Sequence, residues 1–173
     1  MSEAEIPEPA PGEALASLAW REYFEGSTLL TSELERRLKE SADMDLGEFN
    51  ILLVLAECEG LRMRMGDLAR ALAFAPGRLT YRVTALEREG LVLREPSSVD
   101  RRGTDALLTE AGRRRLRKAG PVHARHVEEL FLGGLDREAL EVLHRVFRPL
   151  RDRLLDRRAM VVDDAPDATP ATD

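Results

Sequence analysis

Side chains able to bind nucleic acid lie close together in a helix predicted to begin near Pro76. An arginine can bond the O6 and N7 atoms of one guanine, and a threonine can contact a thymine methyl group or a phosphate. A tyrosine can donate its hydroxyl to the phosphate backbone while lying flat on it. The combination is typical of a helix that reads base edges in duplex DNA. The candidates are Arg78, Thr80, Tyr81, Arg82 and Thr84.

The candidates differ in how squarely they face outward on a helical wheel. Arg78 is the first choice for reading a base, because its guanidinium can make both guanine bonds. Arg82 points less squarely outward than Tyr81, which favours either a phosphate contact or a partner within the chain. The alternative for the whole set is an ordinary solvent-exposed helix face.

The helix that carries these side chains is predicted over residues 76–89. Leu79, Val83 and Leu86 recur at i, i+4 and i+7 and define its inward face. Gly90 allows the left-handed conformation that ends a helix. A shorter helix predicted from about Met65 completes a helix-turn-helix. Before it, Asp45 stands three residues ahead of Glu48, the spacing of a capping box, and predicts the start of another helix.

A second basic group lies at the tip of a predicted β-hairpin. Apolar runs at 91–93 and 106–108 flank turn-forming residues and place Asp100, Arg101 and Arg102 near the tip. Arginine is the residue expected in a narrow minor groove. The alternative is an exposed turn with a weak surface ion pair. A polar helix beside a basic hairpin indicates a winged helix-turn-helix DNA reader.

These stretches together resemble the multiple-antibiotic-resistance regulator (MarR) family. Each piece alone is weak, but their order and spacing over about fifty residues are specific, and flanking helices extend the likeness from roughly residue 13 to 157. The matching pieces are Leu68-Ala69, the L-T-x-x-V-x-x-L-E run at 79–87, Gly90-Leu91-Val92, the D-R-R-G at 100–103, and Leu108-Thr109-x-x-Gly112.

The resemblance implies a dimeric transcriptional regulator, usually a repressor, that binds a palindromic operator in double-stranded DNA. It implies that Asp100 braces the wing and Arg102 enters the minor groove, with Arg101 beside a phosphate. Two departures prevent borrowing a relative's operator: Ala75 stands where a capping Ser or Thr is usual, and Tyr81 and Arg82 replace a common arginine and a common apolar residue.

Charge is distributed unevenly along the 173 residues, whose formal net charge is −6. Residues 61–118 hold fourteen basic and seven acidic side chains, a net +7, whereas residues 1–60 carry −10 and residues 119–173 carry −3. A basic middle between acidic flanks favours a local phosphate contact. The overall acidity therefore does not exclude a nucleic-acid partner.

The predicted fold class is mainly α with a small β-hairpin wing, an α+β arrangement. Residues 1–12 are predicted to be a disordered lead, 45–118 the DNA-binding domain and 158–173 a mostly disordered tail. The ranges 13–44 and 119–157 are predicted to be dimerisation helices, because their apolar stripes are wider than the reader can cover. Whether Pro121 kinks or breaks its helix stays open.

Other function classes find little support. No serine-histidine-aspartate set, phosphate-binding glycine loop or metal signature occurs, so we expect neither an enzyme nor a bound cofactor. The single cysteine and the absence of a long apolar run predict a cytoplasmic protein without a membrane span. The alternative function is a winged-helix protein-interaction module without specific DNA binding.

An effector site is a further expectation, because many members of the family bind aromatic acids. Trp20, Arg21, Tyr23 and Phe24 are the candidates, although an aromatic stripe at helical spacing is more often core or dimer interface. The three histidines more often indicate solvated or core positions than zinc ligands. Cys58 is expected to be a buried structural thiol.

Overall fold

The computed structural model describes residues 11–97 and 103–163, with side chains for 12–97 and 103–157. It is mainly helical with one small sheet, which confirms the predicted fold class. The elements in order are α1 (Pro11–Ala42), α2 (Leu46–Glu57), β1 (Arg62–Arg64), α3 (Met65–Ala71), α4 (Pro76–Arg88), β2 (Val92–Pro96), β3 (Thr104–Leu108), α5 (Glu110–Leu130) and α6 (Arg137–Asp163), with short 3-10 turns at Glu59–Leu61 and Leu132–Gly134.

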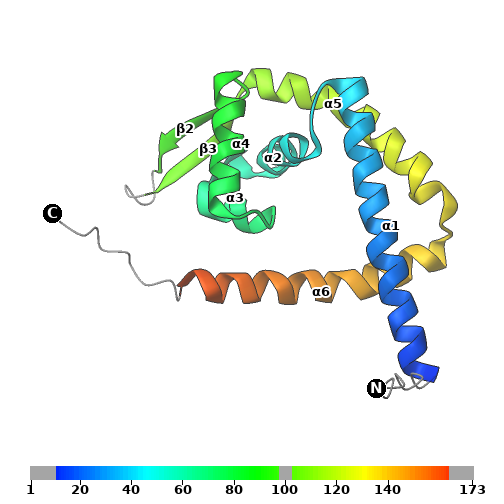
Figure 1. The fold of residues 1–173 in the computed structure, drawn as a ribbon. Helices are drawn as coiled ribbons and strands as arrows, with labels where there is room; N and C mark the ends of the chain where they lie inside the picture. Colours follow the sequence, from blue (N-terminus) through cyan, green and yellow to red (C-terminus); the bar gives the residue numbers. More distant parts are fainter. Residues whose placement is uncertain (1–10, 98–102, 164–173) are drawn as a thin grey trace, which may run out of the picture.

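Residues 46–108, called the reader below, form a compact unit in which α2, α3 and α4 pack against the sheet (Figure 1). Its core is closed mainly by its own side chains, to which Leu38 of α1, Met44 of the turn before α2 and Ala119 of α5 are added. The predicted inward residues of α4 are all buried, as the apolar spacing requires. The largest fully buried side chains include Ile51, Leu52, Leu55, Leu68, Leu79, Val83 and Leu86.

The wing sheet has three antiparallel strands in the order β1-β3-β2, one more than the predicted hairpin. Strand β1 was not predicted, because three residues of which two are arginines give no alternating apolar signal. It pairs with β3, placing Arg62 opposite Leu107 and Arg64 opposite Asp105.

Helices α1 and α6 are called the arms below. The N-terminal part of α1 projects away from the reader, whereas α6 runs back beneath it and contacts α3 (Figure 1). Every residue from 12 to 26 of α1 is exposed, and α6 has no buried residue between 137 and 157. Helix α5 joins the reader to α6 and is one continuous helix across Pro121, so the proline does not break it. The predicted tail at 158–173 begins within α6 and lies mostly outside the described residues, as does the lead at 1–12.

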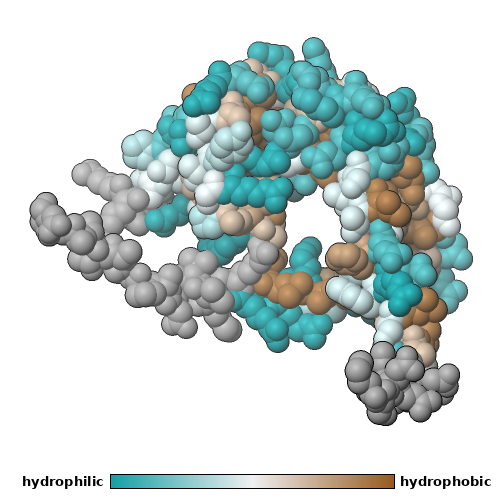
Figure 2. All heavy atoms as spheres, viewed as in Figure 1, coloured by the Kyte–Doolittle hydropathy of each residue, from teal (hydrophilic) through white to brown (hydrophobic). Residues whose placement is uncertain are grey.

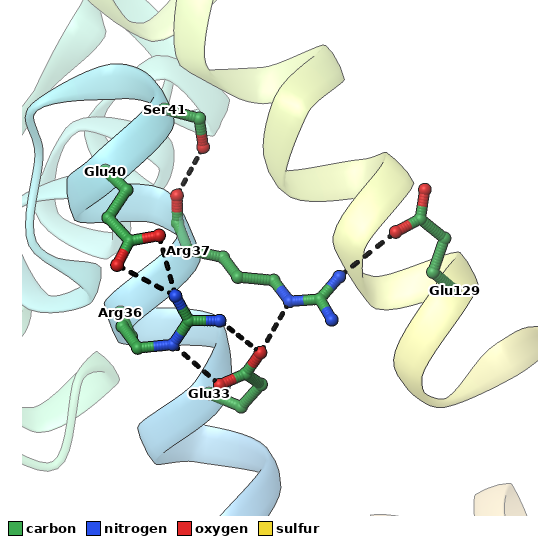
Figure 3. A network of polar contacts seen from close by, with 6 residues as sticks. All are labelled: Glu33, Arg36, Arg37, Glu40, Ser41 and Glu129. Carbon is green, nitrogen blue, oxygen red and sulfur yellow. Dashed lines mark hydrogen bonds and ion pairs between the residues drawn. The ribbon is translucent and has the colours of Figure 1, made fainter.

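An ion-pair network holds α1 against α5 (Figure 3). Arg37 of α1 bonds Glu33 at 2.7 Å on its own helix and Glu129 of α5 at 3.1 Å. Arg36 bonds Glu33 at 2.6 Å and Glu40 at 2.7 Å. Hydrogen bonds from Arg36 and Arg37 lower the pKa of Glu33 to about 2. The network ties the inner half of α1 in place and leaves its outer half projecting.

The arms expose apolar side chains to solvent. Figure 2 shows hydrophobic residues at the surface of α1 and α6 beside an opening that separates the arms from the reader. The exposed apolar residues of the arms include Leu15, Leu18, Trp20, Phe24, Leu29, Leu140, Val142, Val146 and Leu154. In the described part of the chain, no helix combines the length and apolarity needed to cross a membrane.

Candidate nucleic-acid interface

Helix α4 begins without a side-chain cap. Its N-cap residue, Ala75, makes no capping bond, and Pro76 occupies the first turn, where a missing N–H costs nothing. No acidic residue stands in that turn, so the free amides and the positive end of the helix dipole face solvent. This end of α4 is suited to receive an anion such as a phosphate.

The outward face of α4 carries the predicted polar residues. Tyr81 is 78% exposed, the largest value among the exposed large hydrophobic and aromatic side chains of the described residues. Thr80 donates its hydroxyl to the carbonyl of Pro76 at 3.0 Å, and Thr84 donates to that of Thr80 at 2.8 Å. Because both hydroxyl protons are used within the helix, these threonines can offer DNA a methyl group or an accepting oxygen.

Arg78 lies above the ring of Phe74, with its guanidinium carbon 4.9 Å from the ring centroid. This is a cation–π geometry. No carboxylate among the described residues forms an ion pair with Arg78. Its five N–H donors are therefore available, while its position is restricted by the ring.

Arg82 bonds within the chain, one of the two roles that its wheel position left open. Its Nη1 lies 2.5 and 2.6 Å from the two carboxylate oxygens of Asp45, the N-cap residue of α2. A Cβ on Gly47 would meet the Arg82 guanidinium at 2.7 Å, so the glycine makes room for this packing. The predicted capping box of Asp45 and Glu48 is confirmed.

Two opposing effects act on the pKa of the Asp45 carboxyl. Burial raises it. Hydrogen bonds from Arg82 and from the Glu48 amide lower it, as does the charge of Arg82, and together they leave the pKa below its ordinary value of 3.8. The pair stays ionised at neutral pH. It fixes α4 against the start of α2.

The predicted wing residues Asp100, Arg101 and Arg102 lie outside the described residues. The structure describes the base of the hairpin on either side of them. The Ser97 amide donates to the Gly103 carbonyl at 2.9 Å, closing the hairpin on both sides of the tip.

Strand β1 supplies a cation to the acidic base of the wing. Glu95 and Asp105 face each other across β2 and β3, and Asp105 is buried. Like charges opposite each other destabilise a sheet. Arg62 offsets this repulsion, because its guanidinium lies 3.1 Å from Glu95 and 3.8 Å from Asp105. On the other edge Arg94 bonds Glu87 of α4 at 2.5 Å, which attaches the wing to the reading helix.

The Thr109-x-x-Gly112 motif joins the wing to α5. Thr109 caps α5 by accepting from the Gly112 amide at 3.0 Å, and its hydroxyl donates to the Gly90 carbonyl at 2.7 Å. A Cβ on Gly112 would lie 2.2 Å from the Leu91 carbonyl oxygen. Only glycine fits here, so the motif sets the angle between the wing and the long helix.

A cavity of about 700 Å³ lies between α6, α1 and the turn after α3. Of the four predicted effector residues, only Tyr23 lines it. Trp20 stacks on Phe24 with 5.9 Å between ring centroids, and both are exposed. The lining residues are Tyr23, Ala73, His144, Phe147, Arg148, Leu150, Arg151, Leu154 and Leu155.

The remaining reactive side chains have structural surroundings. His126 is buried, and His123 packs on Phe49 with ring centroids 4.5 Å apart. Burial lowers the pKa of His123. Cys58 is half-buried, its thiol donates to the Val54 carbonyl at 3.1 Å, and burial raises its pKa. No group of three metal-ligating side chains occurs among the described residues.

Two contacts in the interface escaped sequence reasoning. Asp45 was identified as a helix cap but not as the partner of Arg82, 37 residues away in the chain. Phe74 was not singled out, although the F-x-x-x-R spacing to Arg78 is a signal that could have found it. Both residues contact arginines of α4.

The three-strand wing sheet and the polar outward face of α4 define a winged helix-turn-helix protein. The family model of the MarR family matches residues 42–103. The chain is 36% identical to AbsC, a MarR family transcriptional regulator from Streptomyces coelicolor, over 86% of this chain and 97% of that one, with a TM-score of 0.77. It is 33% identical to Sco3205 of the same organism, solved in complex with DNA, over 85% and 94% of the two chains, with a TM-score of 0.78.

A shorter match supports the same assignment. Over 70 residues the chain is 33% identical to YkoM, an HTH-type transcriptional regulator of Bacillus subtilis; the match spans 40% of this chain and 46% of that one. The chain belongs to the MarR family of winged-helix, DNA-binding transcriptional regulators. The alternative of a protein-interaction module without specific DNA binding is not favoured.

Proposed function

We propose that the protein is a homodimeric repressor whose two copies of α4 read successive major-groove faces of a palindromic operator. The observation that carries the proposal is the division of α4 between a buried apolar face and a polar face on which Tyr81 is 78% exposed. The uncapped, acid-free start of the helix adds attraction for phosphate. The DNA-binding domain is residues 45–118.

The residue roles follow from what each side chain is free to do. Arg78 reads a base edge, and Tyr81, Thr80 and Thr84 contact phosphates or a thymine methyl group. Arg82 positions α4 through Asp45. In the wing, Arg102 enters the minor groove with Arg101 at a neighbouring phosphate, and Asp100 braces the loop.

The dimer forms through residues 13–44 and 119–157, which include most of both arms and the second half of α5. The support is the exposed apolar surface of α1 and α6, which a second copy of the chain can bury. A dimer also explains the need for a palindrome, since a two-fold axis places the same helix at each half-site.

Footprinting on the DNA upstream of the protein's own gene tests the function, followed by fluorescence anisotropy on the protected duplex. We expect binding to fall steeply with salt, because phosphate contacts release counterions. Arg102→Ala should weaken binding by about 1–3 kcal/mol without changing the dimer. Arg137→Ala is the matched control, since it removes an equal charge from an exposed position of α6. No protected site, or equal losses in both variants, would contradict the proposal.

We further propose that the cavity beside α6 binds a small aromatic acid that promotes release from DNA. Its volume of about 700 Å³ suits a small ligand. The rings of Tyr23 and Phe147 lie 5.2 Å apart at its wall. Arg151 is paired with Asp152 at 2.9 Å, whereas Arg148 has no ion pair among the described residues and is available for a carboxylate. Ala73, in the turn of the helix-turn-helix, also lines the cavity, so a ligand there would contact the reader.

Benzoate is the probe for this site. It should weaken operator binding by the wild-type protein and should have little effect on Arg148→Ala. The matched control is Arg145→Ala on the same helix, which does not line the cavity. A benzoate response that survives in Arg148→Ala would place the ligand elsewhere.

A further inference from the structure

We propose that Phe74 is a specificity-determining positioning residue, whose ring holds the Arg78 guanidinium in the orientation that reads a base. The inference rests on the proposed reading of DNA by α4. It assigns base discrimination to a side chain that lies in the turn before the helix.

The first argument is the position of Arg78 in α4. It is the third residue of the helix, in a first turn that contains no acidic residue. A cation near a helix N-terminus is repelled by the helix dipole. Because no described carboxylate pairs with Arg78, the face of the Phe74 ring, 4.9 Å away, is the interaction that offsets this repulsion.

The second argument is that the ring itself is held in place. Phe74 is half-buried and packs against the core cluster. Its amide donates to the Ala69 carbonyl at 2.9 Å, which fixes the backbone of the turn. The core packing restricts the ring and the hydrogen bond restricts its backbone, so the ring is a rigid surface for the flexible Arg78 side chain.

The third argument concerns the second guanidinium near the same ring. Arg82 lies 6.0 Å from the Phe74 centroid and is fixed there by Asp45. The Arg82 guanidinium therefore occupies space beside the ring that the Arg78 guanidinium cannot enter. Arg78 is thereby directed toward the exposed side of α4, where Tyr81 lies.

Removal of the Phe74 ring should therefore affect sequence specificity and general affinity for DNA differently. An arginine whose plane is already set loses less freedom when it makes two bonds to a guanine. Removing the ring leaves the charge of Arg78 in place, so attraction to phosphate persists. Discrimination between sequences should fall while non-specific binding stays.

The experiment uses the full-length protein and a duplex that the wild type selects from a random-sequence pool. Discrimination is the ratio of its Kd to that for a scrambled duplex of equal length. Phe74→Met keeps the apolar volume without the ring and should reduce this ratio about two- to fivefold. Phe74→Tyr keeps the ring and should retain the ratio. Phe131→Leu, an exposed phenylalanine at the end of α5, is the control for losing a ring elsewhere.

A double-mutant cycle with Arg78→Ala separates positioning from folding. If Phe74 acts through Arg78, Phe74→Met should cause no further loss of discrimination in the Arg78→Ala background. The same loss in both backgrounds, or full discrimination by Phe74→Met, would overturn the inference. If Phe74→Met lowers the Tm by many degrees, Phe74→Leu takes its place, since it also keeps an apolar side chain without the ring and should lose the same discrimination. If the wild type selects no duplex, the proposed function fails as well. This outcome is distinguishable from failure of the Phe74 inference, because it is seen with the wild type before any variant is measured.

Discussion

The reader buries its large apolar side chains, whereas the arms leave many of theirs exposed. In the reader, short elements surround one core, and ten large side chains, nearly all from these elements, are less than 2% exposed. In the arms, long helices carry comparable apolar residues that stay in solvent, with Trp20 63% exposed. A single chain therefore combines a unit with a closed core and helices whose apolar side chains stay exposed.

The comparison explains why the same residue types have different roles. Apolar residues spaced three and four apart are buried in α4, whereas Leu15 and Leu18 of α1 are exposed among the described residues. Contiguous exposed apolar surface on helices marks an interaction site. The apolar spacing is similar in both helices. The difference is that other elements of the reader cover the apolar face of α4, whereas none covers the outer half of α1 in the described structure.

The largest expected effect is the loss of a core side chain in the reader. Leu52 is fully buried, so Leu52→Ala should lower the free energy of unfolding by about 2–5 kcal/mol, through lost burial and a cavity. Urea denaturation measures it. Leu15→Ala is the matched change in an arm. Its effect should depend on protein concentration, whereas that of Leu52→Ala should not, and equal concentration-independent losses would remove the distinction between the regions.

Substitutions in the arms should weaken association of the two copies rather than the folding of each copy. Trp20→Ala should weaken the dimer by about 2 kcal/mol or more, because large aromatic side chains dominate interfaces. Sedimentation velocity over a concentration series measures this, with far-UV circular dichroism as the check on helix content. Arg21→Ala, on the neighbouring exposed position, is the control. An unchanged dimer, or a wild type that stays monomeric, would contradict the role given to the arms.

The two regions also differ in how far local sequence patterns predict them. Helical periodicity predicted α4 and its inward face, and the Asp45-Glu48 spacing predicted the cap of α2, because each depends on residues one or two turns apart. Strand β1, the Arg82–Asp45 pair and the Phe74–Arg78 contact were not predicted. The first is too short for a pattern, the second joins distant segments, and the third depends on the turn geometry. The cavity lining escaped too, since α1, α6 and the turn meet only in the folded chain.

A smaller effect concerns the ion pair inside the reader. Asp45→Asn keeps a capping side chain but removes the charge opposite Arg82, so it isolates the pair from the cap. We expect a loss of about 1–2 kcal/mol at pH 7, discounted for partial solvent exposure of both partners. Because the folded pKa of Asp45 lies below 3.8, its contribution is present above that pH and is lost as pH falls below it.

Urea denaturation of both proteins between pH 7 and pH 3 checks the sign. The difference between wild type and Asp45→Asn should be constant near neutrality and shrink below about pH 4. Glu33→Gln in the arm network is the comparison, because hydrogen bonds from Arg36 and Arg37 lower the pKa of Glu33, whose side chain is 33% exposed, to about 2. A difference for Asp45→Asn that grows at low pH would rule out the ion pair as its cause.

The smallest expected effect lies where the two regions meet. Ala73 follows α3 with φ of 54°, a left-handed conformation that strains a side chain with a Cβ, and it also lines the cavity beside α6. Ala73→Gly should stabilise the reader by about 0.5–1 kcal/mol, since relief of strain exceeds the added freedom of the unfolded chain. Urea denaturation measures the gain, and Ala71→Gly at the end of α3 is the control that should lose stability. If Ala73→Gly is instead destabilising, the methyl group contributes contacts to α6 that outweigh the strain, and the boundary between reader and arms is more tightly coupled than their burial indicates.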